Sequence, residues 1–197
     1  MDPGTTGTRG GPPDERAGRR VCRRRGQAGR RAPRPGTDVS AELVVELDVA
    51  APAELVWDTV MDWPRQGDWI LATRVEVTAG DGRSVGSRVS AVTGVGPLGV
   101  VDTMVVTEWT EQRPSGPFRC VVDHTGKVVR GDGVFEVVDR GPGRCRFRWV
   151  ERLDLPLGAL GRLGWPVVRP AMRAGVAHSM GRMARECEQR HRSGSGA

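Results

Sequence analysis

Two titratable side chains, His124 at the end of one predicted strand and Glu151 within another, share their strand face with apolar residues. The residues that share their parity are Phe118, Cys120 and Val122 for His124, and Phe147 and Trp149 for Glu151. Imidazole titrates near neutral pH, which makes His124 a candidate general acid or base. A carboxylate on an apolar row, such as that of Glu151, could orient a ligand hydroxyl or enolise a polyketone.

Both residues also have structural interpretations. His124 could be hydrogen-bonded at the turn that Thr125 and Gly126 form, and Glu151 could lie in water at the sheet edge or pair with an arginine. His178 and Ser179 are adjacent, but no Asp is placed to complete a nucleophilic triad. We therefore keep His124 and Glu151 as the weak catalytic candidates.

Residues 94–99 spell the pattern G-x-G-x-x-G, which in dinucleotide-binding folds links a strand to a helix. Here Pro97 lies inside the motif and another strand pattern follows it, so a hairpin turn is expected.

The four cysteines have no C-x-x-C spacing and the three histidines do not cluster, which disfavours a zinc site. We expect semi-buried free thiols, no metal and no cofactor.

The positive charge of the chain is unevenly distributed. The net charge is +6, and residues 1–38 alone hold ten Arg against four acids, while residues 39–197 hold twenty Arg or Lys and twenty acids. Because a folded nucleic-acid-binding domain carries its own basic stripe, no specific binding of nucleic acid is expected. Residues 1–38, rich in Arg, Gly and Pro, are predicted to be disordered; they could be a basic arm or an extension without function.

The length of 197 residues predicts one domain. No apolar run approaches the roughly 18 residues of a membrane-spanning helix, and the N-terminal segment lacks the apolar core of a signal peptide. These features predict a cytoplasmic protein, a monomer or a weak homodimer.

Hydrophobic periodicity predicts an α+β domain over residues 39–191, followed by a disordered end at 192–197. An opening strand at 43–49 precedes two short helices near 53–61 and 65–70. Six further strands follow at about 73–79, 86–93, 100–110, 117–124, 129–138 and 144–154. A final helix is expected to begin near Val168–Pro170, with an apolar stripe of Val168, Met172, Val176, Met180, Met183 and Cys187. The expected fold is a seven-stranded antiparallel sheet wrapped around this long helix, with an apolar pocket between them.

Several segments together resemble the START-like, helix-grip superfamily, and within it the bacterial polyketide cyclase/dehydrase-type (SRPBCC) domains. They are residues 44–52, Trp57, Trp69, residues 106–109, residues 131–137 and residues 147–151. The resemblance covers about residues 41–190. It implies a hydrophobic small molecule or lipid as the ligand, and it transfers no catalytic residue because only some members are enzymes.

Three functions follow as hypotheses. The first is a soluble binder or carrier of a lipid- or polyketide-like molecule; the others are a polyketide cyclase, aromatase or dehydratase, and a non-catalytic regulatory or interaction protein. The residues expected to line the pocket are Trp69, Met104, Cys120, Val122, His124, Phe135, Phe147, Trp149, Glu151, Met172, Val176 and Met180. Turnover would require His124 and Glu151 to approach the same ligand atom.

Overall fold

A computed structural model describes residues 40–94, 99–154 and 159–194, with the side chains of residues 40 and 159–162 excepted. The predictions for residues 1–38 and for the turn at 95–98 lie outside these described residues.

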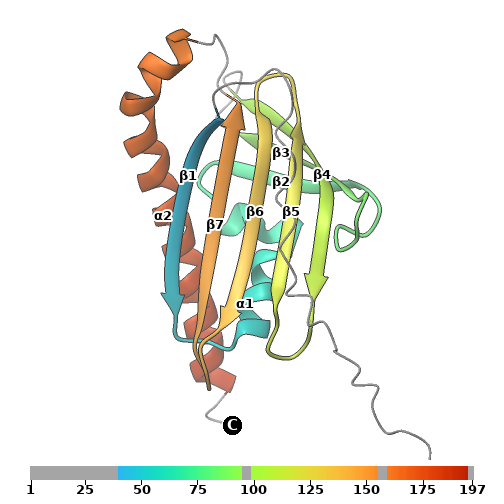
Figure 1. Cartoon of the computed structure of the whole chain (residues 1–197). Coiled ribbons are helices and arrows are strands. Elements are labelled where there is room, and N and C mark those ends of the chain that lie inside the picture. Colours follow the sequence, from blue (N-terminus) through green and yellow to red (C-terminus); the bar gives the residue numbers. More distant parts are fainter. Residues whose placement is uncertain (1–39, 95–98, 155–158, 195–197) are drawn as a thin grey trace, which may run out of the picture. The chain divides into compact units, whose positions relative to one another are not determined.

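The described chain forms an antiparallel sheet with helices on one face (Figure 1). Its elements are β1 Ser40–Val49, α1 Ala53–Val60, the 3₁₀ helix η1 Trp63–Asp68, β2 Thr73–Ala79, β3 Arg88–Thr93, β4 Val100–Glu111, β5 Phe118–Thr125, β6 Arg130–Asp139, β7 Cys145–Asp154 and α2 Ala159–Gly194. The strand order is β1-β7-β6-β5-β4-β3-β2, and every neighbouring pair is antiparallel. The predicted helix-grip arrangement is confirmed.

Strand alternation places one face of the sheet in the core. In β5 every second residue from Phe118 to His124 is buried, and β6 buries Gly133, Phe135 and Val137. These side chains pack with α1, η1 and the second half of α2 in a single apolar cluster. The residues of β5 that share parity with His124 thus face the core, as does the β6 row that includes the predicted pocket residue Phe135.

The start of α2 differs from the prediction. The helix begins at Ala159 rather than near Val168, and Pro166 and Pro170 lie inside it. Each proline removes one intrahelical N–H donor, yet the helix continues on both sides. It also extends through residues 192–194, which we had expected beyond the folded domain.

The predicted apolar stripe of α2 is correct in its second half and wrong at its start. Met180, Met183 and Cys187 are buried, whereas Val168 is 50% exposed. Of residues 163–170, only Trp165 is partly covered, because this part of α2 lies beyond the packed core. His178 is exposed as predicted.

The predicted apolar stripe of α2 leaves out Ser179, yet the structure buries this residue. It is 2% exposed and its Oγ accepts a hydrogen bond from the Leu71 N–H at 3.4 Å. This contact ties α2 to the segment that follows η1. The predicted free thiols are confirmed for Cys120, Cys145 and Cys187, all of which are buried.

Candidate functional site

Three charged side chains meet on the core face of the sheet, near the ends of β4, β5 and β7. His124 lies opposite Met104 in the β4–β5 register. Its ring bridges two carboxylates: Nδ1 is 2.8 Å from Asp102 Oδ2, and Nε2 is 3.0 Å from Glu151 Oε2. The structure thus brings the two predicted candidates, His124 and Glu151, into direct contact and adds Asp102.

A tryptophan continues this array. Trp149 Nε1 donates a hydrogen bond to Glu151 Oε1 at 2.6 Å, so both oxygens of that carboxylate are engaged. The Trp149 ring lies 5.0 Å from Phe135 and 6.1 Å from Trp69, measured between ring centroids. The polar array therefore borders an aromatic row, with Trp149 belonging to both.

Two glycines of β6 lie where a side chain would collide with a neighbour, and Gly133 is the one beside the array. A Cβ on Gly133 would lie 3.3 Å from His124 Nε2 and 3.4 Å from Glu151 Oε1. A Cβ on Gly131, which has φ of +123°, would lie 1.9 Å from the Arg152 carbonyl oxygen. The segment at 131–133 is thus shaped by close approach of its neighbours rather than by turn geometry.

The surroundings of His124 favour its charged form. Burial alone lowers an imidazole pKa, but the hydrogen bonds and negative charges of Asp102 and Glu151 outweigh burial and raise the His124 pKa to about 10. His124 is consequently an imidazolium at neutral pH, and both of its N–H groups donate to carboxylates. A ring in this state cannot accept a proton, so it does not act as a general base.

The remaining predicted pocket residues divide into two groups. Those buried in the core are Trp69, Met104, Cys120, Val122, Phe135, Phe147 and Met180. Those only partly buried are Trp149, Glu151, Met172 and Val176. Burial raises the pKa of the Cys120 thiol to about 12, so Cys120 is no nucleophile at neutral pH. The partly buried group comes from β7 and α2.

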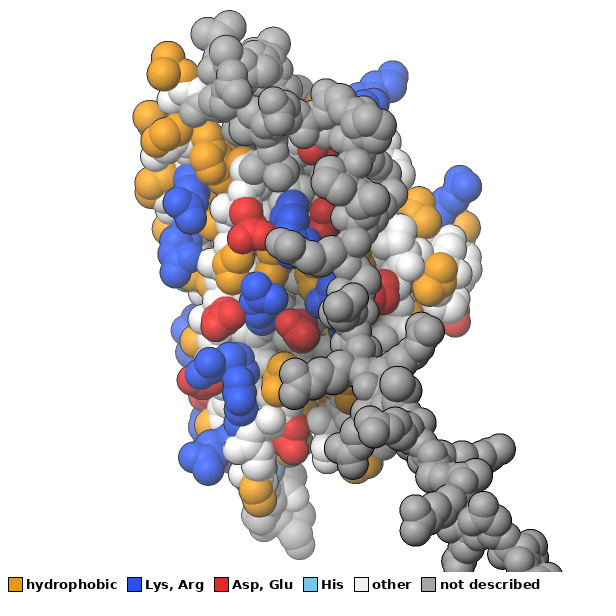
Figure 2. Space-filling view, in the orientation of Figure 1, with side chains coloured by type: hydrophobic (Ala, Val, Ile, Leu, Met, Phe, Trp, Pro, Cys, Tyr) orange, Lys and Arg blue, Asp and Glu red, His pale blue; other side chains and the backbone are white. Residues whose placement is uncertain are grey.

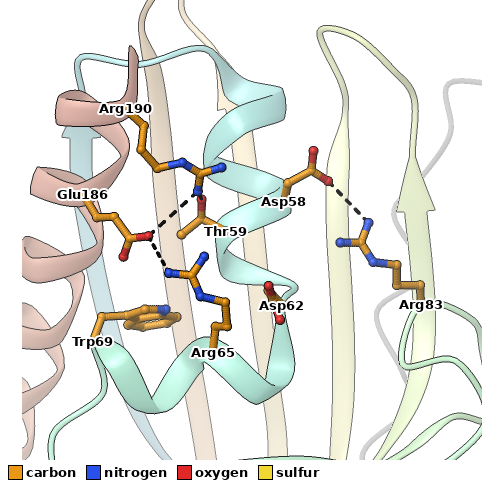
Figure 3. A pocket seen from close by; sticks show the side chains of 8 residues that line it. All are labelled: Asp58, Thr59, Asp62, Arg65, Trp69, Arg83, Glu186 and Arg190. Atoms are coloured by element: carbon orange, nitrogen blue, oxygen red, sulfur yellow. Dashed lines mark hydrogen bonds and ion pairs between the residues drawn. The ribbon is translucent and has the colours of Figure 1, made fainter. Parts of the chain in front are cut away.

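A separate cavity of about 180 Å³ lies where α1 and η1 meet the second half of α2 (Figure 3). Its lining is mainly charged and comprises Asp58, Thr59, Asp62, Arg65, Trp69, Arg83, Glu186 and Arg190. Arg65 donates to Glu186 at 3.2 Å, Arg190 donates to Thr59 at 3.1 Å, and Arg83 pairs with Asp58 at 3.3 Å. These mutual pairs hold helices together, and sequence spacing did not predict them because the residues come from distant segments.

Among the described residues, no cluster of His, Cys, Asp and Glu has a metal-binding arrangement. Within the same part of the chain, no helix is both long and apolar enough to cross a membrane.

Residues 40–188 match the family described as polyketide cyclase/dehydrase and lipid transport. The chain belongs to this family. The match spans almost the whole of the described domain, which confirms the resemblance inferred from the sequence. No curated protein matches the chain.

Solved structures with the same fold come from several organisms. A protein from Thermus thermophilus is 18% identical with a TM-score of 0.61, and covers 74% of this chain and 95% of its own. The Zhui aromatase/cyclase from Streptomyces sp. R1128 is 18% identical with a TM-score of 0.56, and the match covers 77% of this chain and 96% of the aromatase/cyclase chain. A START superfamily protein from Mycobacterium smegmatis is 16% identical with a TM-score of 0.53, and the match covers 77% of this chain and 97% of the Mycobacterium chain. At these identities the likeness shows the fold alone.

Proposed function

We propose that this family member binds an apolar small molecule, lipid-like or polyketide-like, between the core face of the sheet and α2. The ligand would contact the partly buried side chains Trp149, Met172 and Val176. Apolar and aromatic walls with few polar groups are typical of sites for such molecules. Family membership supports the same ligand class.

We favour binding over catalysis because both ring nitrogens of His124 already take part in hydrogen bonds. Its two nitrogens donate to Asp102 and Glu151, at 2.8 and 3.0 Å. A general base needs a free lone pair, and this ring offers none. The array is therefore a fixed polar group beside the aromatic row rather than a proton acceptor.

A second candidate, a cyclase or dehydratase, rests on the same array. An imidazolium can donate a proton, and Glu151 lies in direct contact with it. The solved aromatase/cyclase shares the fold. In this alternative His124 would protonate the leaving hydroxyl of the ligand, Glu151 would take a proton from the adjacent ligand carbon, and water would depart as the double bond forms.

Glu151→Gln separates the two functions. Binding and turnover of aromatic polyketone and fatty-acyl probes would be measured for the wild type and for this variant. If the protein only binds its ligand, the affinity of Glu151→Gln stays within a few-fold of the wild-type affinity, and neither protein turns the probes over. Turnover by the wild type that falls about a hundredfold in the variant would establish the enzyme instead. Arg148→Gln, on the opposite face of β7, is the control.

A further inference from the structure

The first half of α2 carries an apolar surface that is turned away from the sheet. Leu163 is 80% exposed, Val167 79% and Val168 50%. Figure 2 shows hydrophobic side chains gathered over this part of the helix, with basic side chains beside them. We call Leu163, Val167 and Val168 the outer face of α2. Large apolar side chains exposed together in this way mark an interaction surface.

The charged residues of this part of α2 itself are all basic. Residues 159–185 contain five Arg and no Asp or Glu, and the first acid of α2 is Glu186. Arg169 and Arg173 are exposed on the same half of the helix. A helix that combines exposed apolar residues with basic ones favours contact with an anionic lipid surface.

A second apolar surface lies at the same end of the sheet. A groove of about 520 Å³ is lined by the start of β4 and by the β5–β6 turn, including Val101, Lys127 and Val128. Val101 is 53% exposed and Val128 is 62% exposed. In the register Gly131 at the start of β6 faces Leu153 at the end of β7, which places the β5–β6 turn and the end of β7 at one end of the sheet, and the first turns of α2 lie at the same end (Figure 1).

We propose that this end of the domain docks on an anionic lipid bilayer through the outer face of α2, with the groove as a second contact. The apolar side chains would enter the interfacial region while the arginines meet lipid phosphates. A second copy of this chain fits less well, because it would bring one acid-free, arginine-bearing helix against another. Residues 1–38 are almost without apolar side chains and do not match the surface. The proposal does not depend on the ligand bound inside the domain.

The test is flotation of the full-length chain with vesicles of phosphatidylglycerol and with vesicles of phosphatidylcholine, at physiological salt. The wild type is expected to float with the anionic vesicles. Val167→Asp would place a carboxylate against the lipid and should reduce binding about tenfold or more. Val85→Asp is the matched control, because Val85 is 64% exposed in the β2–β3 connection. All variants keep residues 1–38, so any attraction of that basic segment to the anionic vesicles contributes equally to each of them.

A charge variant completes the test. Arg169→Glu should weaken binding to the anionic vesicles while circular dichroism stays unchanged. Equal flotation of the wild type and Val167→Asp would overturn the proposal, as would a wild type that binds neither vesicle. A dimer in solution that Val167→Asp dissociates, with vesicle binding unaffected, would also overturn it and assign the surface to a second copy.

Discussion

His124 is the residue on which the chemistry of the candidate site depends. Its side chain is 5% exposed and is held between two carboxylates. Burying such charges is unfavourable unless they are compensated, and here the imidazolium donates one N–H to each of Asp102 and Glu151 and supplies one positive charge between the two carboxylates. Removing the ring would leave two acids facing each other without a cation.

The raised His124 pKa predicts that the protein loses stability as the solution becomes more basic. The pKa is about 10 in the folded state, against 6.5 for an ordinary histidine. The contribution of His124 to the free energy of unfolding is therefore fully present below pH 6.5, and it declines as the pH rises toward the pKa of His124 in the folded state. The free energy of unfolding should fall by up to about 1.4 kcal/mol per pH unit between roughly pH 6.5 and 8.5. Urea denaturation across this interval measures it.

Two variants control the pH experiment. His124→Gln should be less stable and should lose the pH dependence, whereas His178→Gln, on the exposed side of α2, should keep it. The interval stops at pH 8.5 because the buried thiols Cys120 and Cys145 also have raised pKa values and would contribute at higher pH. A wild-type stability that is flat over this interval would contradict the charged state of His124.

Parity along single strands selected His124 and Glu151 from the sequence, but we did not apply it to Asp102 and could not see that the three residues meet. Asp102 shares its parity with the buried Met104 and Val106, so an inward carboxylate could have been noticed. Which residues meet across strands depends on register, and the β4–β5 register shifts at an irregularity between Val106 and Glu108. Such a shift leaves no clear sequence pattern.

At the scale of elements, the second half of α2 closes the core. Met180 and Met183 are fully buried in the same apolar cluster as the sheet residues. Met180→Asp would bury a carboxylate without a partner and should lower the free energy of unfolding by several kcal/mol. Thermal or urea denaturation measures the change.

His178→Asp is the matched substitution for this prediction, because it introduces the same side chain two residues away on the exposed face. It should cost less than about 1 kcal/mol. Equal losses of stability in the two variants would contradict the orientation of the helix.

The element boundaries show where sequence periodicity stops being informative. The apolar spacing from Met172 onward predicted the buried face of α2 because that part packs on the domain. Prolines 166 and 170 suggested a helix start, yet the helix begins earlier and its first part faces solvent. Where packing does not constrain a helix, its buried face cannot be inferred from spacing.

For the whole molecule, the fold followed from strand alternation and from turn residues between strands, which together specify a meander around one long helix. The size of an internal cavity could not be predicted from the sequence, because it depends on how the side chains fill the space between the sheet and α2. Most of the predicted pocket residues pack into the core, and Trp149, Met172 and Val176 are left partly covered. The proposed binding function rests on that remaining group.

Ligand retention tests the binding function most directly. The full-length protein would be purified under native conditions, and extracted small molecules identified by mass spectrometry. We predict that the wild type and the exposed control Leu71→Ala, at a residue 58% exposed, retain one apolar molecule, and that Trp149→Ala loses it while remaining folded. A wild type that carries no apolar molecule and binds none of the polyketone or fatty-acyl probes, or a Trp149→Ala variant that retains the wild-type complement, would contradict the account.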